Sequence, residues 1–163
     1  MNKVLVVDDD LSVIAAYRHV LEGLDRLNGY HQPATLADLD GELFGQTGRQ
    51  EPEVIRLRVD FVDQGGDAIE AVRDSVARAD PYAVIFLDLR MPPGLDGYET
   101  AEQIRRLDPD VQIVFVSAYY DYTAEDLVSV AGPLSRVRIL HKPVWPRELG
   151  SVVQQAVTRS DHH

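Results

Sequence analysis

The sequence predicts an α/β fold, a doubly wound sheet of five parallel strands with helices on both faces. Short apolar runs alternate along the chain with stretches in which apolar residues recur at helical spacing. The runs at residues 4–7 and 83–87 are apolar throughout, which is typical of strands buried on both faces of a parallel sheet. Several runs end in polar residues, and folds of this class bind their ligands at the carboxyl ends of the strands.

The N-terminal part of the chain predicts a first strand at about residues 3–7 and a first helix after it. The helical spacing is formed by Leu11, Ile14, Tyr17, Leu21 and Leu24. Residues from about 28 to 53 are rich in Gly, Gln and Pro and form an insertion before the second strand. Within this insertion, apolar residues on one helical face predict a short helix at about residues 35–44.

The second strand is expected at an edge of the sheet. Charged residues alternate there with the apolar residues Ile55, Leu57, Val59 and Phe61. A period of two predicts one buried and one solvated face. Because an exposed edge can pair with another chain, we expect the insertion to cover this edge. The Gly-Gly pair at residues 65–66 then leads into a helix that reaches about residue 77.

The second half of the chain predicts three further pairs of strand and helix. The strands are expected at about residues 83–87, 111–116 and 137–140, and the helices at about 98–107, 123–130 and 146–158. The last helix begins at Pro146, because proline is favourable at the first position of a helix. Trp145 is expected to pack against the start of this helix.

Length and composition limit the functions that the chain can have. Its 163 residues suit a single domain, residues 1–163. The net charge of −11 argues against direct binding to nucleic acid, which requires a basic face. The chain has no cysteine, so disulfides and thiolate metal sites are excluded. No apolar run approaches the roughly 20 residues of a membrane span, and no signal peptide is recognisable, so a cytoplasmic location is expected.

Polar residues at the strand ends form the candidate site. The first strand ends in Asp8, Asp9 and Asp10, and the third ends in Asp88. If these strands are neighbours, as many as four carboxylates meet at one edge of the sheet, and like charges so close require a cation between them. Taken alone, three consecutive aspartates are more often a solvated turn with a helix cap.

The remaining strand ends add a hydroxyl and an ammonium group. Ser117 ends the fourth strand, and Lys142 follows the fifth. Carboxylates with few other protein ligands suit Mg²⁺ better than a closed calcium cage. A carboxylate close to a metal ion, a lysine and a hydroxyl is a plausible phosphoryl acceptor, because aspartate nucleophiles form aspartyl phosphates. Asp96 and Gly97, in contrast, are interpreted as turn residues.

These residues, in this order, resemble the receiver domains of bacterial response regulators in two-component signalling, including the chemotaxis regulators. The resemblance covers the chain except for the insertion. The matching segments are Val6-Val7-Asp8-Asp9-Asp10, Asp88 with Met91-Pro92 and Asp96-Gly97, Ser117-Ala118, and Lys142-Pro143. Each segment alone is a weak signal, but all of them together at strand ends are very specific. The resemblance implies a flavodoxin-like receiver fold with strand order 2-1-3-4-5.

The resemblance also implies a role for each site residue. Asp88 would receive a phosphoryl group from a sensor histidine kinase or a phosphotransfer protein. Asp9 and Asp88 would bind Mg²⁺ together with the backbone carbonyl of Arg90, and Asp8 would assist through water. Ser117 and Lys142 would hold phosphoryl oxygens. The Lys142-Pro143 bond is usually cis in the family.

The family also implies what the modification achieves. Phosphorylation would switch binding to a downstream protein target or to a second copy of the chain, through the face near residues 123–136 and the fifth strand. The receiver would catalyse only its own phosphorylation and dephosphorylation. No output domain is expected within this chain, because only about a dozen residues follow Gly150 and they complete the last helix.

Four positions depart from the family pattern. Pro93 lengthens the loop after Met91 by one residue. Ile139 occupies the position of the aromatic switch residue on the fifth strand, and the nearby Tyr119, Tyr120 and Tyr122 are the alternatives for that role. Arg90 and Tyr119 occupy the two positions that tune dephosphorylation. Because both side chains are large enough to screen the attacking water, we expect slow autodephosphorylation.

Two other functions stay open at this point. One is a receiver-like interaction module that is not phosphorylated. The insertion argues mildly for this module, whereas the intact set of polar residues at the strand ends argues against it. The other is a Mg²⁺-dependent phosphatase with an aspartyl nucleophile. Enzymes of that kind typically carry a second aspartate two residues after the nucleophile, where this chain has Arg90.

Overall fold

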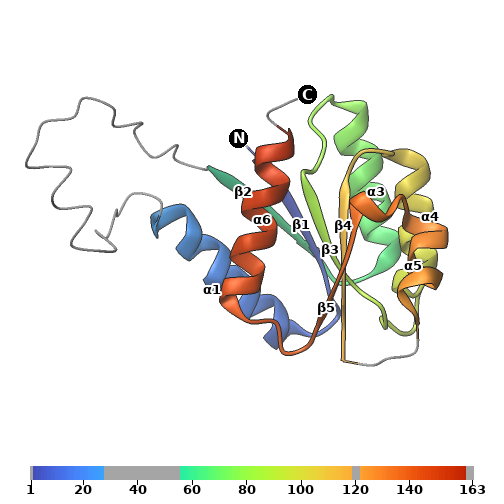
Figure 1. Ribbon diagram of the computed structural model, residues 1–163, viewed down its shortest axis with the longest axis horizontal. Helices are drawn as coiled ribbons and strands as arrows, with labels where there is room; N and C mark the ends of the chain where they lie inside the picture. Colours follow the sequence, from blue (N-terminus) through green and yellow to red (C-terminus); the bar gives the residue numbers. More distant parts are fainter. Residues whose placement is uncertain (1, 28–55, 119–121, 161–163) are drawn as a thin grey trace, which may run out of the picture.

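Five parallel strands form a sheet through the middle of the molecule. The computed structural model describes residues 2–27, 56–118 and 122–160 (Figure 1). Across the sheet the strands are β2 (Leu57–Val62), β1 (Asn2–Val7), β3 (Val84–Asp88), β4 (Gln112–Ser117) and β5 (Val137–His141). All four neighbouring pairs are parallel. The predicted fold class and strand order 2-1-3-4-5 are therefore confirmed.

The central strands of the sheet are more deeply buried than the two edge strands. Every residue of β3 and β4 is buried, as are all residues of β1 except Asn2. These strands have a neighbour on each side, so their apolar runs never meet water. The edge strands β2 and β5 are only partly buried. The predicted edge position of β2 is correct, but its polar face is not fully solvated, because Asp60 accepts a hydrogen bond from the hydroxyl of Tyr82 at 2.7 Å.

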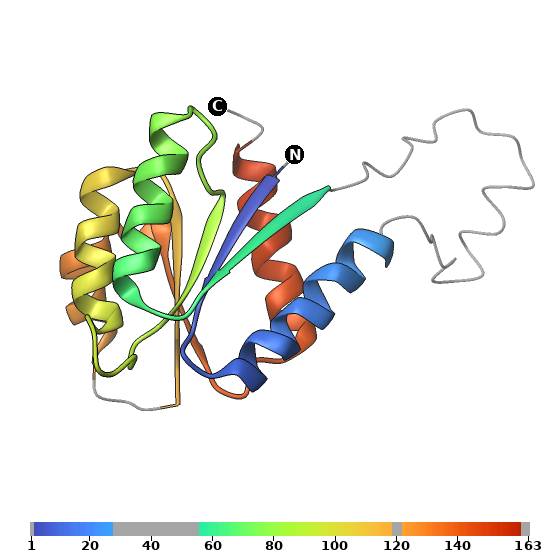
Figure 2. The ribbon, with the colours of Figure 1, turned by 180° about the vertical axis from the view of Figure 1, so that it is seen from behind.

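Helices cover both faces of the sheet (Figures 1 and 2). On one face lie α1 (Leu11–Leu27) and α6 (Pro146–Ser160), whose buried side chains pack with those of the strands in one hydrophobic cluster. On the other face lie α3 (Gly65–Ala77), α4 (Gly97–Leu107) and α5 (Ala124–Ala131), with a second cluster beneath them. A short 3-10 helix, Leu134–Arg136, leads into β5.

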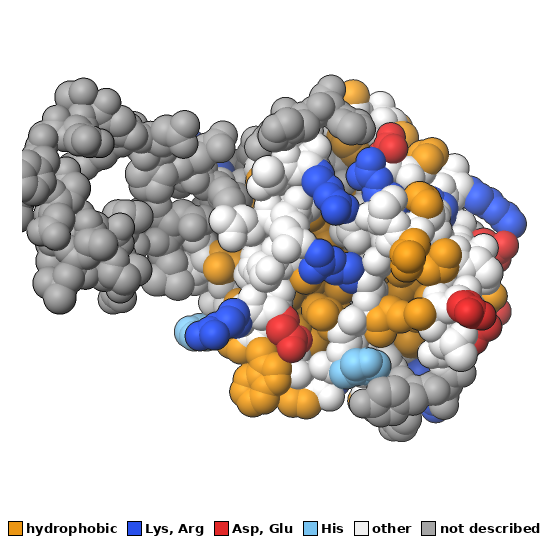
Figure 3. All heavy atoms as spheres, in the orientation of Figure 1, with side chains coloured by type: hydrophobic (Ala, Val, Ile, Leu, Met, Phe, Trp, Pro, Cys, Tyr) orange, Lys and Arg blue, Asp and Glu red, His pale blue; other side chains and the backbone are white. Residues whose placement is uncertain are grey.

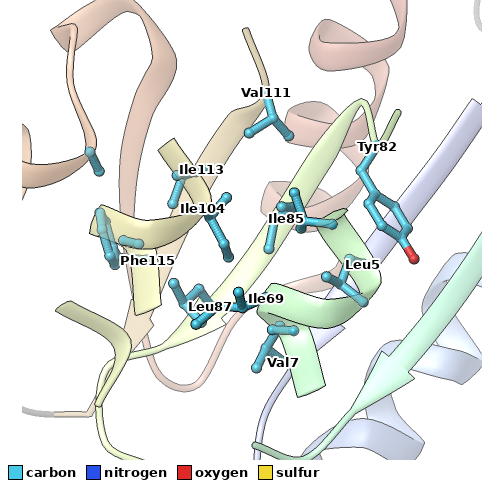
Figure 4. Packing of buried hydrophobic residues seen from close by; sticks show 14 of the residues in the cluster. Leu5, Val7, Ile69, Tyr82, Ile85, Leu87, Ile104, Val111, Ile113 and Phe115 are labelled. Atoms are coloured by element: carbon cyan, nitrogen blue, oxygen red, sulfur yellow. The ribbon is translucent and has the colours of Figure 1, made fainter. Parts of the chain in front are cut away.

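The second cluster shows why alternate residues of a strand serve different layers. Figure 4 shows Ile85 and Leu87 of β3 close to Ile69 of α3 and Ile104 of α4. The intervening Phe86 belongs to the cluster under α1 and α6. Each fully buried side chain of this size contributes about 1.5–3 kcal/mol relative to an exposed one. Two apolar layers on one sheet fix the strand register and, with it, the positions of the strand ends.

The predicted elements inside the described residues all exist, with ends that differ from the observed ones by a few residues. The predicted helix at residues 35–44 and the role of the insertion at 28–53 lie outside the described residues, as does Ile55. The expectation for Trp145 is wrong, because its side chain is 64% exposed. Trp145 precedes the first residue of α6, and the buried side of that helix begins only at Leu149. None of the helices in the described ranges is long and apolar enough to span a membrane.

Candidate functional site

The parallel register of the sheet brings the two acidic strand ends together. Val7 of β1 lies opposite Leu87 of β3, so Asp8 and Asp88 follow at the same level. Both side chains are buried, with exposed fractions of 2% for Asp8 and 7% for Asp88. Two carboxylates that have lost most of their water lie side by side at this edge, as the sequence predicts for neighbouring strands.

Three carboxylates form the acidic cluster. Oxygen atoms of Asp8, Asp9 and Asp88 all lie within 4.8 Å of one another. Asp10 has another role. Its Oδ1 accepts hydrogen bonds from the backbone N–H of Ser12 at 2.9 Å and from the Ser12 hydroxyl at 2.6 Å. These bonds lower the pKa of Asp10. The expected upper count of four carboxylates is therefore too high, because the fourth carboxylate is used at the start of α1.

Lys142 lies between the two buried carboxylates. Its Nζ is 3.0 Å from Oδ2 of Asp8 and 3.3 Å from Oδ2 of Asp88. The other oxygen of each carboxylate accepts a backbone N–H, from Asp10 at 2.9 Å and from Arg90 at 3.2 Å. Both carboxylates are thus held in the same manner. One oxygen of each is fixed by the strand–loop turn, and the other is shared with the ammonium group.

The electrostatics of the cluster favour binding of a further cation. Burial raises the pKa of Asp88, and the negative charge of Asp8 raises it further, to about 6, although Lys142 opposes both effects. Burial also lowers the pKa of Lys142, but its hydrogen bond to Asp8 and the charge of Asp88 outweigh burial, so that its pKa is raised overall. Lys142 is therefore a cation at neutral pH. Three carboxylates around one ammonium leave negative charge uncompensated, and hard oxygen ligands in this arrangement fit Mg²⁺.

Ser117 lies on the same rim of the sheet. Asp88 is opposite Val116 in the pairing of β3 with β4, and Ser117 is the next residue. Ser117 is buried, and its carbonyl accepts the N–H of Lys142 at 3.0 Å. This backbone hydrogen bond joins Ser117, the last residue of β4, to Lys142, which directly follows β5. The Lys142-Pro143 bond that follows is cis, as expected for the family.

The loop between Asp88 and α4 is fixed by α4 itself. Asp96 is the N-cap of this helix, and its Oδ1 accepts the N–H of Glu99 at 2.8 Å. Gly97 donates its N–H to the carbonyl of Leu89 at 2.9 Å. A Cβ on Gly97 would lie 2.3 Å from the carbonyl oxygen of Asp88, so only glycine allows this approach. Asp96 is outside the acidic cluster, in agreement with its interpretation as a turn residue.

Sequence reasoning missed two features near the site. The hydroxyl of Tyr122 donates to Oδ2 of Asp96 at 3.3 Å, and the ring of Tyr122 stacks on that of Tyr98. No local pattern signals this contact, because the residues are far apart along the chain. The second feature is a largely apolar cavity of about 450 Å³ beside Lys142, between the start of α1 and the start of α6. Its lining includes Tyr17 and Leu149. Tyr119 and Tyr120 lie outside the described residues.

Comparison with known proteins identifies the family. Residues 40–154 match the response regulator receiver domain. The chain belongs to this family. Receiver domains act in two-component signalling, as the sequence predicted. The matched region begins after β1, so Asp8 and Asp9 lie outside it, and their place in the site comes from the pairing of β1 with β3.

Individual relatives agree with this assignment. The cyclic di-GMP phosphodiesterase response regulator RpfG of Xanthomonas campestris is 30% identical over 149 residues. That match covers 90% of this chain but 29% of the relative. The chain thus spans less than a third of that protein.

Solved structures agree on the fold. A CheY-like receiver domain from Methanospirillum hungatei has a TM-score of 0.64 at 17% identity, with 100% of this chain and 99% of the other covered. A CheX–CheY complex with BeF3 and magnesium from Borrelia burgdorferi has a TM-score of 0.60 at 15% identity, with 98% and 88% covered. At such identities the likeness shows the fold alone.

Proposed function

We propose that this receiver domain accepts a phosphoryl group on Asp88 from a phosphohistidine of a sensor histidine kinase or a phosphotransfer protein. The observation that carries the proposal is the surroundings of Asp88. It is buried, lies 3.3 Å from the ammonium group of Lys142, and shares a cluster with Asp8 and Asp9. A carboxylate with this combination of neighbours is suited to nucleophilic attack on phosphorus.

In the proposed transfer, a carboxylate oxygen of Asp88 attacks phosphorus in line with the bond to the donor nitrogen. That P–N bond breaks, its electron pair stays on the histidine, and the imidazole gains a proton from solvent. The ammonium group of Lys142 moves from Oδ2 of Asp88 to a phosphoryl oxygen. Lys142 exchanges one negatively charged oxygen for another in this step. The Ser117 hydroxyl donates to another phosphoryl oxygen. These groups neutralise charge on the oxygens that do not react.

Asp8, Asp9 and Asp88 would hold Mg²⁺, with the backbone carbonyl of Arg90 as a further ligand. The uncompensated negative charge of the three carboxylates supports this assignment. When bound, Mg²⁺ supplies positive charge that offsets the charge of the transferring phosphoryl group. The Borrelia burgdorferi homologue with BeF3 and magnesium supports the same chemistry for a protein of the same fold. We expect the chain to catalyse only its own phosphorylation and dephosphorylation, and the latter slowly, because Arg90 and Tyr119 are large.

The output of the switch is proposed to be a protein contact at the face formed by α5, β5 and α6. Figure 3 shows hydrophobic side chains between α6 and α5, with basic side chains beside them. The edge strand β5 lies in this face, and Leu134 just before it is largely exposed. A downstream protein target or a second copy of the chain is the proposed partner. The net charge of −11 argues against direct nucleic-acid binding, and membrane insertion is not proposed.

Incubation with acetyl phosphate and Mg²⁺, followed by mass spectrometry of the intact protein, tests the proposal. We expect an adduct of one phosphoryl group that requires Mg²⁺ and is absent from Asp88→Asn. Asp63→Asn is the matched control, because Asp63 is an exposed carboxylate outside the acidic cluster. If the wild-type protein forms no adduct and binds no beryllofluoride, the proposed phosphorylation is refuted. The unphosphorylated interaction module is then the function that remains. Turnover of acetyl phosphate without a lasting adduct would indicate the phosphatase.

A further inference from the structure

The cavity beside Lys142 lies between α1 and α6, on the face of the sheet that these two helices cover. The two helices lie side by side there (Figures 1 and 2). Among its lining residues, Tyr17 of α1, Val116 of β4 and Leu149 of α6 are buried. Ala16 also lines the cavity but is exposed, so the cavity reaches the surface beside α1. A largely apolar cavity of about 450 Å³ has the size of a site for a small organic molecule.

The hydroxyl group of Tyr17 is the first polar feature of this cavity. Tyr17 is 5% exposed, and its ring packs on that of Phe86. No residue in the described ranges forms a hydrogen bond with the Tyr17 hydroxyl. Every fully buried polar side-chain atom among the described residues does have a partner, so the Tyr17 oxygen is not sealed in the core and faces the cavity. Because buried tyrosine hydroxyls usually have a partner, this one points to a bound molecule.

The protonation of Tyr17 makes it a hydrogen-bond donor. Burial raises the pKa of Tyr17, and the negative charges of Asp8 and Asp88 raise it further. The hydroxyl therefore keeps its proton at neutral pH. A molecule in the cavity that offers a hydrogen-bond acceptor can use this proton.

Lys142 supplies a second donor to the same cavity. It is one of the lining residues, and its ammonium group carries three protons. The contacts of Nζ with Asp8 at 3.0 Å and with Asp88 at 3.3 Å use two of these protons. The third can be donated to an acceptor in the cavity. Apolar walls with two donors suit an apolar molecule that carries a hydrogen-bond acceptor.

The charges around the cavity favour an uncharged molecule. A cation in the cavity would meet the ammonium group of Lys142. An anion would approach the acidic cluster, whose three carboxylates Lys142 alone does not balance. A carbonyl oxygen accepts hydrogen bonds without either repulsion.

We propose that this cavity is a binding site for a small, uncharged, largely apolar molecule whose carbonyl oxygen accepts hydrogen bonds from Tyr17 and Lys142. The apolar walls supply affinity by removing the hydrocarbon surface of the ligand from water, and the two donors fix its orientation. The site shares Lys142 with the acidic cluster, but it takes a different class of ligand and does not depend on phosphorylation of Asp88.

Acetophenone, an aromatic ring with a single carbonyl oxygen, is the probe for this site. Titration of metal-free protein, followed by chemical-shift changes in ¹H–¹⁵N spectra, reports both affinity and location. We expect saturable changes at the residues that line the cavity. Tyr17→Phe keeps the ring on Phe86 and should weaken acetophenone binding about threefold, through the loss of a hydrogen bond. Ethylbenzene lacks the carbonyl and should bind the wild type and Tyr17→Phe equally.

Two alanines of α1 provide a matched pair of variants. Both are exposed, but Ala16 lines the cavity and Ala15 does not. A leucine is tolerated at an exposed helix position, so both variants should fold. Ala16→Leu should fill the cavity and abolish acetophenone binding, whereas Ala15→Leu should bind acetophenone like the wild type.

Several outcomes would overturn the proposed site. These are a wild-type protein without saturable shifts, shifts remote from the cavity, or equal acetophenone affinity of the wild type and either Ala16→Leu or Tyr17→Phe. Tighter binding of benzoate, which carries a carboxylate, than of acetophenone would refute the uncharged class of ligand. Because the titrations contain no phosphoryl donor, such results would leave the proposed phosphorylation of Asp88 intact.

Discussion

At the scale of single residues, the three consecutive aspartates Asp8, Asp9 and Asp10 have different roles. Asp8 is buried and pairs with Lys142, Asp9 is exposed but belongs to the acidic cluster, and Asp10 accepts two hydrogen bonds from Ser12. The difference follows from backbone direction. The chain leaves β1 at Asp8 and has entered α1 by Leu11, so successive side chains point to different surroundings.

Asp9 and Asp10 therefore give a prediction with a built-in control. We expect Asp9→Asn to weaken Mg²⁺ binding about tenfold or more, a size of effect typical even of residues that only orient metal ligands. Asp10→Asn should bind Mg²⁺ almost as the wild type does, because asparagine can still accept the bonds from Ser12. Calorimetric titration with MgCl₂ measures both affinities. Equal losses in the two variants would contradict the assignment of the cluster.

At the scale of secondary structure, helix ends place the loops of the site. The helix α4 is capped by Asp96, and its first residue lies directly against the backbone of Asp88. The helix α5 is capped by Thr123 and Asp126, next to Tyr122. The Asp96 side chain satisfies one of the first N–H groups of α4 and so fixes the start of that helix. The loop after Asp88 is in this way held by α4, which contributes no residue to the acidic cluster.

Two glycines at helix starts allow a test of this arrangement. A Cβ at Gly97 would meet the backbone of Asp88 and Leu89, whereas a Cβ at Gly66 of α3 would meet nothing within 4 Å. We expect Gly97→Ala to lower the free energy of unfolding by about 1–3 kcal/mol, the usual effect of overpacking, and to weaken Mg²⁺ binding by displacing Asp88. Gly66→Ala should be neutral or stabilise by up to about 1 kcal/mol. Urea denaturation measures both, and a destabilised Gly66→Ala with an unaffected Gly97→Ala would contradict the packing.

At the scale of the whole molecule, the proposed function requires a local arrangement that weakens the fold. Three carboxylates lie close together at the end of a buried sheet in a protein whose net charge is already −11. The hydrophobic layers on both faces of the sheet supply the stability that such a cluster needs. Binding of a cation to the folded state alone would offset part of the repulsion by mass action.

This balance predicts how stability depends on pH in metal-free protein. The pKa of Asp88 is raised from 3.8 to about 6, so between these values the folded state keeps a proton that the unfolded state has lost. Stability from this group is therefore present below pH 3.8 and is lost as pH rises to about 6. Asp88→Asn cannot lose that proton. We expect it to be more stable than the wild type at pH 7 by about 1–3 kcal/mol, and not at pH 4.

Urea denaturation in EDTA at several pH values measures this difference between wild type and Asp88→Asn. The comparison cancels the contribution of other carboxylates, such as Asp10 and Asp126, whose pKa values are lowered. Addition of Mg²⁺ should reduce the advantage of Asp88→Asn at pH 7. A difference in stability that is the same at pH 4 and pH 7 would contradict the raised pKa of Asp88.

The sequence by itself determined the order of strands and helices, because the periods of apolar residues are local properties of the chain. It also placed Asp8, Asp88, Ser117 and Lys142 on one rim, because parallel strands end at the same edge of a sheet. Asp10 leaves the cluster through a local contact, its hydrogen bonds with Ser12. Tertiary structure decided which oxygens Lys142 contacts and that Tyr122 binds Asp96. Those outcomes depend on register and on contacts between residues distant in the chain, and no local pattern of residues encodes them.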